Sequence, residues 1–186
     1  MKTKTKSVGS TLILVLSCLI IACCENKHNE SDPNFIVEDF EPDLVITSDN
    51  QMLIDIDKDG TDDLKIFQQP ISSHYEPVFV SADSLFQISN EHYNIYNDPS
   101  LKLISEGDSI NTNLTWLNQL TWMSGGEGIK VFLALKKEDK DGNLYFGWLL
   151  PMIKYSESSN FEIIIDKYVF CKLKNYEIKA GQERGE

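Results

Sequence analysis

Residues 52–67 read MLIDIDKDGTDDLKIF and carry the clearest strand and turn signals of the chain. Two short apolar runs, 52–56 and 64–67, flank a loop in which aspartates alternate with other residues. Runs of about four to eight Ile, Leu, Val and aromatic residues, bounded by Asp, Asn and Gly, predict β-strands joined by turns. A similar run, 44–47, precedes them at a comparable interval. This part of the chain is therefore expected to form consecutive short strands.

The second half of the chain repeats the strand signal as a strict alternation. Every second residue in 129–135 is a branched aliphatic one, and 161–166 alternate in the same way. A period of two predicts a sheet with one buried face. No apolar stripe of helical spacing persists outside the N-terminal segment. The predicted fold class is all-β, an antiparallel β-sandwich or a related two-sheet fold, with long irregular loops in the middle, 74–124.

The N-terminus has the pattern of an export signal. Three lysines stand within the first six residues, and an apolar run, 8–22, follows them. That run is too short to span a membrane, because a spanning helix needs roughly 20 apolar residues. It ends in LIIAC, 19–23, which resembles the lipobox cleaved by lipoprotein signal peptidase. Residues 1–22 are therefore predicted to be a lipoprotein signal peptide, and Cys23 to carry the lipid that anchors the chain to a bilayer.

This anchor predicts a location and limits the roles of the other cysteines. Several acyl chains on one cysteine hold a protein at a membrane almost permanently. We therefore expect the chain at the cell envelope of a Gram-negative-type bacterium, at the outer membrane. The sequence does not indicate which leaflet carries it. Cys24 is the rival lipidation site, but it would put Cys23 where the signal peptidase prefers Ala, Gly or Ser. Export permits a disulfide between Cys24 and Cys171; the alternative is that Cys171 is a small buried hydrophobe.

Composition and charge set the domain organisation and exclude one class of partner. Residues 25–34 contain no apolar side chain, so 23–34 are predicted to be the lipidated cysteine and a flexible tether. Residues 35–186 then form a single β domain, and 41% hydrophobic with 25% charged residues is a globular composition. The net charge of −12 repels phosphate backbones, so we expect no nucleic-acid partner. It suits cations and basic partners, or simply a solvated acidic surface.

The loop in the opening stretch has the spacing of a calcium ligand set. With Asp55 as position 1, carboxylates fall at positions 1, 3, 5 and 9 and a glycine at 6. Calcium prefers about six to eight hard oxygens, and such spacing folds alternate side chains inward. We therefore expect a structural calcium ion held by Asp55, Asp57, Asp59 and Asp63 and by the carbonyl of Thr61. The alternative is an exposed acidic turn whose charges are solvated.

The calcium-type loop differs from an EF-hand. Position 12 is Ile66 instead of glutamate, and strands rather than helices are expected on both sides. The loop resembles the strand-loop-strand calcium turns of integrin-type propeller repeats. A second acidic turn, 138–143, lies between two predicted strands but lacks the full ligand set. We interpret it as an ordinary hairpin connection through Asp141 and Gly142.

Five short segments occur in an order that resembles one protein family. They are FEPD at 40–43, the calcium-type turn ending at 63–64, GIKV at 128–131, YFGW at 145–148 and AGQ at 180–182. This order resembles a group of uncharacterised, secreted or lipid-anchored bacterial β-sandwich proteins. The resemblance covers most of 35–182 and implies a β-sandwich. It implies no activity, ligand or catalytic residue.

The sequence shows no pattern of nucleophilic or metal-dependent catalysis. Its three histidines form no His-x-His or His-Glu-x-x-His pair, and no Gly-x-Ser-x-Gly is present. Distant carboxylates such as Glu76, Glu91 and Glu127 leave a glycan hydrolase open, because the acids of glycosidases need no local motif. A carboxylate-dependent glycan hydrolase therefore stays open as the less favoured alternative to a protein without catalytic activity.

Aromatic residues in the irregular middle favour a binding module for a glycan or a protein. Trp116, Trp122, Tyr93 and Tyr96 can stack on sugar rings or contact a partner, or can pack into the core. Trp148 is expected in the core, because it alternates with the apolar residues of a predicted strand. The function we expect is a calcium-stabilised, lipid-anchored extracytoplasmic binding module. A structural subunit of a membrane-associated complex is the alternative.

Overall fold

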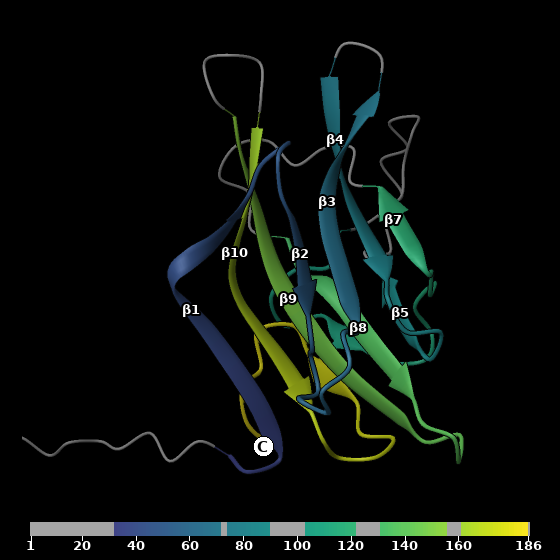
Figure 1. Ribbon diagram of the computed structural model, residues 1–186. Coiled ribbons are helices and arrows are strands. Elements are labelled where there is room, and N and C mark those ends of the chain that lie inside the picture. Colours follow the sequence, from purple (N-terminus) through teal and green to yellow (C-terminus); the bar gives the residue numbers. More distant parts are fainter. Residues whose placement is uncertain (1–31, 72–73, 90–102, 122–130, 156–160, 186) are drawn as a thin grey trace, which may run out of the picture. The chain divides into compact units, whose positions relative to one another are not determined.

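The computed structural model describes residues 32–71, 74–89, 103–121, 131–155 and 161–185 (Figure 1). These residues contain strands and turns and no helix, and accordingly none of them forms a helix able to cross a membrane. The predicted signal peptide, Cys23 and most of the tether lie outside the described residues. The strands are β1 (Phe35–Ile46), β2 (Gln51–Ile54), β3 (Leu64–Ile71), β4 (His74–Ser81), β5 (Phe86–Ser89), β6 (Ser109–Ile110), β7 (Gln119–Thr121), β8 (Leu133–Glu138), β9 (Leu144–Tyr155), β10 (Phe161–Cys171) and β11 (Ile178–Lys179).

Two antiparallel sheets account for most of the strands (Figure 1). The five-stranded sheet has the order β1-β10-β9-β8-β5, and the four-stranded sheet has the order β2-β3-β4-β7. Strands β6 and β11 pair only with each other and form a short third sheet of two strands. The predicted all-β, two-sheet fold is therefore confirmed. The register also explains the opening stretch, because Ile54 of β2 faces Leu64 of β3 across the loop that joins them.

The main core lies between the two sheets. Ile54, Leu64, Ile66 and Phe79 of the four-stranded sheet are at most 6% exposed. They belong to one cluster with residues of the five-stranded sheet, among them Phe86, Leu133, Leu135, Leu149, Ile163, Ile165, Tyr168 and Phe170. Each fully buried aliphatic or aromatic side chain contributes about 1.5–3 kcal/mol relative to an exposed one. The alternating residues of the predicted strands supply this core, because a strand turns every second side chain to the same face.

A second core covers the other face of the five-stranded sheet. Ala134, Phe146, Trp148 and Val169 pack there against residues from outside the sheet, including Ile104, Ile110, Ile178 and Ala180. The expectation of one buried face is therefore wrong for the middle strands: β8 and β9 are covered on both sides. This second core could not be predicted from the sequence, because β6 and β11 are only two residues long and leave no periodic signal.

Trp148 is buried as predicted, at 2% exposure. Its indole Nε1 donates a hydrogen bond to the Gln182 carbonyl at 2.9 Å, and its ring meets Phe132 edge to face with centroids 5.3 Å apart. A buried indole N–H that finds an acceptor avoids a desolvation cost of about 1–3 kcal/mol. Trp148 therefore ties the C-terminal residues near Gln182 to β9.

The middle of the chain is only partly irregular. Residues 103–118 have little regular structure, as expected, with β6 as their only named strand. β4 is in contrast a regular strand of eight residues, paired along its whole length with β3. Phe79 points into the main core, and Val78, which points to the opposite face of the sheet, is also buried. Within the described part of 74–124, the expected irregular structure is therefore found mainly in 103–118.

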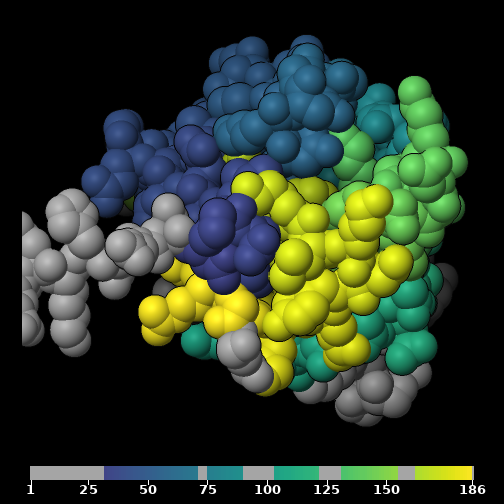
Figure 2. Space-filling model, turned by 90° about the horizontal axis from the view of Figure 1, so that it is seen from below, coloured from purple at the N-terminus to yellow at the C-terminus, as the bar shows by residue number. Residues whose placement is uncertain are grey.

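The two ends of the described domain meet at one end of the sandwich (Figure 2). Asp32 accepts a hydrogen bond from the Gly185 N–H at 2.8 Å, and the Asn34 carbonyl accepts one from the Lys172 N–H at 2.7 Å. The last residues of the predicted tether are thus bound to the domain. Cys171 is buried and is a free thiol, whereas Cys24 lies outside the described residues.

Candidate metal centre

Residues 55–63, which we call the aspartate loop, connect β2 to β3 and fold around their own carboxylates. The two oxygens of Asp55 accept the N–H groups of Asp59 and Gly60, at 3.1 and 2.8 Å. Asp59 Oδ1 accepts the Thr61 N–H at 2.8 Å. Gly60 has a φ of 92°, in the left-handed region that suits glycine. The side chains of the alternating aspartates therefore hold the turn in shape by accepting hydrogen bonds from its own backbone.

Asp63 closes the loop from the inside. Its side chain is fully buried, and its Oδ2 accepts the N–H groups of Ile56 at 2.9 Å and Asp57 at 3.3 Å. The neighbouring Asp62 is exposed. Burial raises the pKa of the Asp63 carboxyl, and the hydrogen bond from Lys137 opposes that rise. A buried carboxylate of this kind requires a cationic partner.

Three aspartates of the loop form a group that can hold a metal ion. Asp55, Asp57 and Asp63 each offer a carboxylate oxygen, and these oxygens all lie within 4.8 Å of one another. Three of the five residues predicted from the spacing are thus brought together. Asp59 is outside this group, and Thr61 contributes a backbone donor to Asp59. Donors that are all hard oxygens fit a cation such as calcium better than a soft transition metal.

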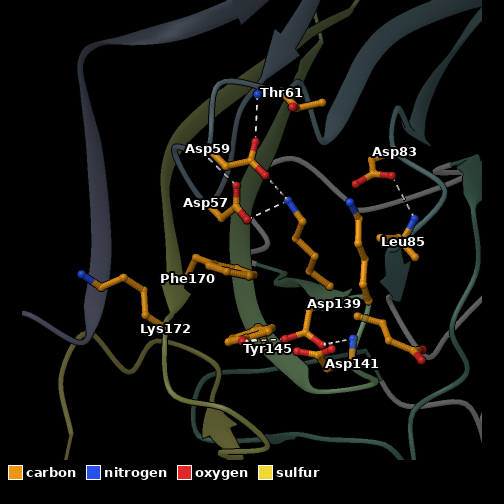
Figure 3. A pocket seen from close by; sticks show the side chains of 13 residues that line it. Asp57, Asp59, Thr61, Asp83, Leu85, Asp139, Asp141, Tyr145, Phe170 and Lys172 are labelled. Atoms are coloured by element: carbon orange, nitrogen blue, oxygen red, sulfur yellow. Dashed lines mark hydrogen bonds and ion pairs between the residues drawn. The ribbon is translucent and has the colours of Figure 1, made fainter.

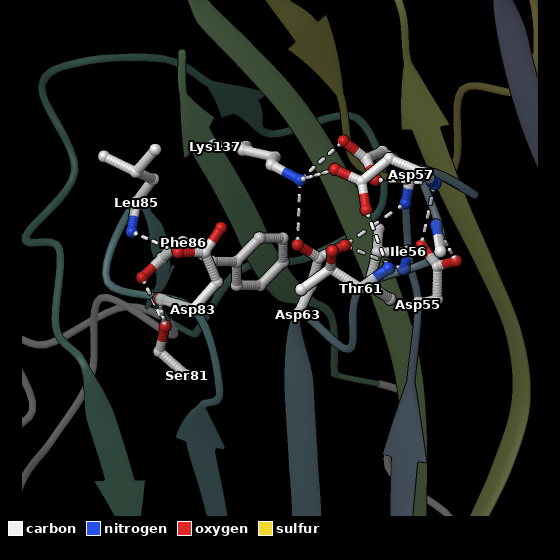
Figure 4. A network of polar contacts seen from close by, with 12 residues as sticks. Asp55, Ile56, Asp57, Thr61, Asp63, Ser81, Asp83, Leu85, Phe86 and Lys137 are labelled. Carbon is white, nitrogen blue, oxygen red and sulfur yellow. Dashed lines mark hydrogen bonds and ion pairs between the residues drawn. The ribbon is translucent and has the colours of Figure 1, made fainter. Parts of the chain in front are cut away.

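Lys137, a residue that sequence reasoning missed, already places a positive charge at the loop (Figure 4). Its Nζ lies 2.7 Å from Asp57 Oδ2, 3.0 Å from Asp59 Oδ2 and 3.0 Å from Asp63 Oδ1. One signal could have found it: Lys137 continues the inward-facing series of Leu133 and Leu135 on β8. A lysine at an inward position at the end of a strand needs an acidic partner.

The charges of this group depend on one another. Burial opposes the charged form of Lys137, but its hydrogen bonds to Asp57, Asp59 and Asp63 outweigh that effect and raise its pKa. The hydrogen bond from Lys137 lowers the pKa of Asp59 in turn. Lys137 and Asp59 thus each favour the charged form of the other.

The aspartate loop also contacts the five-stranded sheet. The Tyr168 hydroxyl of β10 donates to the Asp55 carbonyl at 3.4 Å. Lys58 lies over the Tyr168 ring, with Nζ 5.5 Å from the centroid, and pairs with Glu38 of β1 at 3.3 Å. Both sheets therefore hold the aspartate loop in position.

A cavity of about 660 Å³ opens beside the loop (Figure 3). Asp57 and Asp59 lie on one side of it, Asp139 of the β8–β9 turn and Tyr145 of β9 on the opposite side, and Asp83 of the β4–β5 turn on a third. Three connections that are distant in sequence thus meet here. Their acidic side chains outnumber the basic ones in the lining.

The second acidic turn is a hairpin connection, as predicted. Glu138 of β8 pairs with Leu144 of β9, and Gly142 has a φ of 79°. Asp139 accepts hydrogen bonds from the N–H and the side-chain amide of Asn143 and from the Tyr145 hydroxyl. These contacts lower the pKa of Asp139 to about 2. The turn contributes no group of metal ligands among the described residues.

The predicted aromatic contact residues fall mostly outside the described structure. Trp122, Tyr93 and Tyr96 lie in undescribed segments. Trp116 is half-buried, packs against Phe146 with centroids 6.0 Å apart and carries Lys136 over its ring at 5.0 Å. Trp116 is not part of the cavity lining.

The fold and the site define an all-β, two-sheet domain with an aspartate loop that can hold a metal ion. Comparisons of the chain with protein-family models, with curated proteins and with solved structures give no match.

Proposed function

We propose that this protein is a calcium-stabilised binding module, exported and held at the outer membrane by a lipid on Cys23. The observation that carries the proposal is the convergence of Asp55, Asp57 and Asp63 beside a cavity. Calcium would supply two positive charges to this group of carboxylates, where Lys137 supplies one. Its role is structural: it fixes the aspartate loop, which forms one wall of the cavity.

The choice of calcium rests on the chemistry of the donors. The grouped ligands are carboxylates, without histidine or cysteine among them. Calcium accepts about six to eight oxygens in flexible geometry, so waters and further loop oxygens can complete its shell. Magnesium demands stricter octahedral geometry and keeps its own waters. The spacing of Asp55, Asp57, Asp59 and Asp63 also suits a calcium loop.

The binding role rests on the cavity. Three connections converge on a hollow of about 660 Å³, within the size range of ligand sites in proteins. Half-buried Tyr145 stands at its wall, stacked on the buried Phe170 with centroids 6.5 Å apart, and the exposed part of an aromatic ring of this kind can receive a sugar ring. Carboxylates around them can accept hydrogen bonds from hydroxyl groups. We therefore propose a glycan as the first ligand class to test and a protein segment as the second.

A glycan array probed with the purified full-length chain tests this function. We expect specific binding in calcium that is weakened by a chelator, because the loop forms one wall of the cavity. Tyr145→Ala should abolish the signal, whereas Lys154→Ala, an exposed change on the same strand, should leave it intact. An array without signal, together with no partner in a peptide screen, rejects the binding module.

A further inference from the structure

Lys137 occupies the point at which three carboxylates of the aspartate loop converge (Figure 4). Its ammonium has three N–H donors, and three carboxylate oxygens lie within 2.7–3.0 Å of it. Its side chain is 11% exposed, and that of Asp63 is fully buried. The lysine is therefore a resident cation of the loop rather than a surface side chain that happens to pass near it.

The carboxylates divide their oxygens between the backbone and this lysine. Asp57 Oδ1, Asp59 Oδ1 and Asp63 Oδ2 each accept a backbone N–H of the loop. The opposite oxygen of each carboxylate contacts Lys137. The oxygens of Asp57 and Asp63 that the backbone leaves free for a metal are therefore the oxygens that the ammonium holds.

We infer that Lys137 is an internal competitor for the metal, so that calcium binds the aspartate loop by displacing the Lys137 ammonium from Asp57 and Asp63. This inference rests on the proposed calcium site and adds its regulation. A calcium ion at about 2.3–2.6 Å from these oxygens leaves no room for an ammonium at the same oxygens. Two cations at such range also repel each other, and the burial of the Asp63 and Lys137 side chains strengthens that repulsion.

The cavity gives the displaced side chain a place to go. Lys137 lines it together with Glu138, Asp139 and Asp83, so the released ammonium remains among carboxylates. Calcium uptake then changes the charge that the cavity presents to a ligand. In the metal-free loop the ion pairs with Lys137 hold the carboxylates together, and in the metal-bound loop calcium does so.

Calcium titration of the purified full-length chain by calorimetry tests the competition. Lys137→Met should lower the calcium Kd about tenfold or more, because it removes a charge that opposes the ion. Lys137→Arg keeps the charge and should stay near the wild type. Lys167→Met is the matched control, because Lys167 also makes ion pairs, with Asp39 and Glu183, but away from the loop. If Lys137→Met folds poorly, Lys137→Gln replaces it.

Amine labelling read by mass spectrometry gives an independent measurement on the unmodified chain. Lys137 should resist acetylation in chelator and become reactive in saturating calcium. Lys154, which is exposed, should react equally in both conditions. A lysine with a purely structural role would show no change with calcium.

The outcomes separate the inference from the function on which it rests. Calcium binding that is equal in the wild type and in both neutral variants, with Lys137 unreactive throughout, overturns the competition and leaves the calcium site standing. No calcium binding in any variant overturns both. Tighter binding in the neutral variants, with Lys137 exposed by calcium, establishes the exchange.

Discussion

Asp63 and Ile56 close the aspartate loop: the Asp63 carboxylate accepts the Ile56 N–H at 2.9 Å across the neck of the turn. Both side chains are fully buried between the sheets. The loop is thus anchored in the core at the base of β3, although its tip, with Asp59 and Gly60, is exposed. A calcium site built here would be coupled directly to the packing of the two sheets.

Asp63→Ala should destabilise the domain strongly. It removes the acceptor for the N–H groups of Ile56 and Asp57 and one of the three carboxylates around Lys137. Breaking one member of a buried ion pair costs roughly 3–5 kcal/mol. Urea unfolding measures the loss. Asp62→Ala, the exposed neighbour, should change the free energy of unfolding by less than about 0.5 kcal/mol, and similar losses in both variants would contradict the anchoring role of Asp63.

Chelation should lower the melting temperature of the wild type. A ligand that binds only the folded state stabilises it in proportion to the logarithm of its concentration above Kd, by about 2.7 kcal/mol at one hundred times Kd. The double change Asp57→Asn with Asp59→Asn should abolish this dependence. Differential scanning calorimetry with and without chelator is the measurement. A wild-type melt that is unchanged in excess chelator speaks against the metal.

Asp139 should contribute to stability only above its acidic titration range. Its pKa is lowered to about 2 from the ordinary 3.8, so its contribution is fully present above pH 3.8 and is lost as the pH falls toward 2. The difference in melting temperature between the wild type and Asp139→Ala should therefore become smaller as the pH falls from 3.8 toward 2. Thermal melts from pH 5 to pH 2 measure it. A gap that is constant over this range would disprove the assignment.

Gly147→Ala should disrupt the packing of β9 on β10. A Cβ at Gly147 would lie 2.5 Å from the Val169 carbonyl oxygen and 2.8 Å from Phe170 Cδ2, too close for any Cβ contact. Overpacking of this kind costs about 1–3 kcal/mol, and more where the backbone is the obstacle. Lys154→Ala on the same strand is the control. Chemical denaturation of both variants decides, and equal stability would refute the predicted clash.

Cys23→Ala should abolish lipidation, and Cys24→Ala should preserve it. The reason is the position of the two residues relative to the lipobox at 19–23. Labelling of cells with an alkyne fatty acid, followed by fractionation, measures both incorporation and membrane association. Label retained by Cys23→Ala and lost by Cys24→Ala would move the anchor by one residue.

The strands and the aspartate loop could be predicted because their signals are local. Period two in 129–135 placed Leu133 and Leu135 inward, and the spacing from Asp55 to Asp63 lies within a single turn. Each pattern needs only a few neighbouring residues, so the chain displays it directly.

The partner of the loop could not be predicted because it is remote. Lys137 and Asp63 are 74 residues apart in the sequence, and they meet only because the five-stranded sheet packs on the four-stranded sheet. The second core was missed for a related reason: Ile110 and Ile178 lie in two-residue strands, which are too short to show a pattern. Sequence reasoning therefore found the elements, and the structure supplied the contacts between them.

A crystal structure of the chain grown with calcium would show whether the ion takes the place of the Lys137 ammonium. We predict an ion bound by carboxylate oxygens of Asp55, Asp57 and Asp63 at about 2.3–2.6 Å, with the Lys137 ammonium withdrawn toward the cavity. Crystals in saturating calcium in which Lys137 still contacts Asp57 and Asp63, with no ion among the three aspartates, would contradict it.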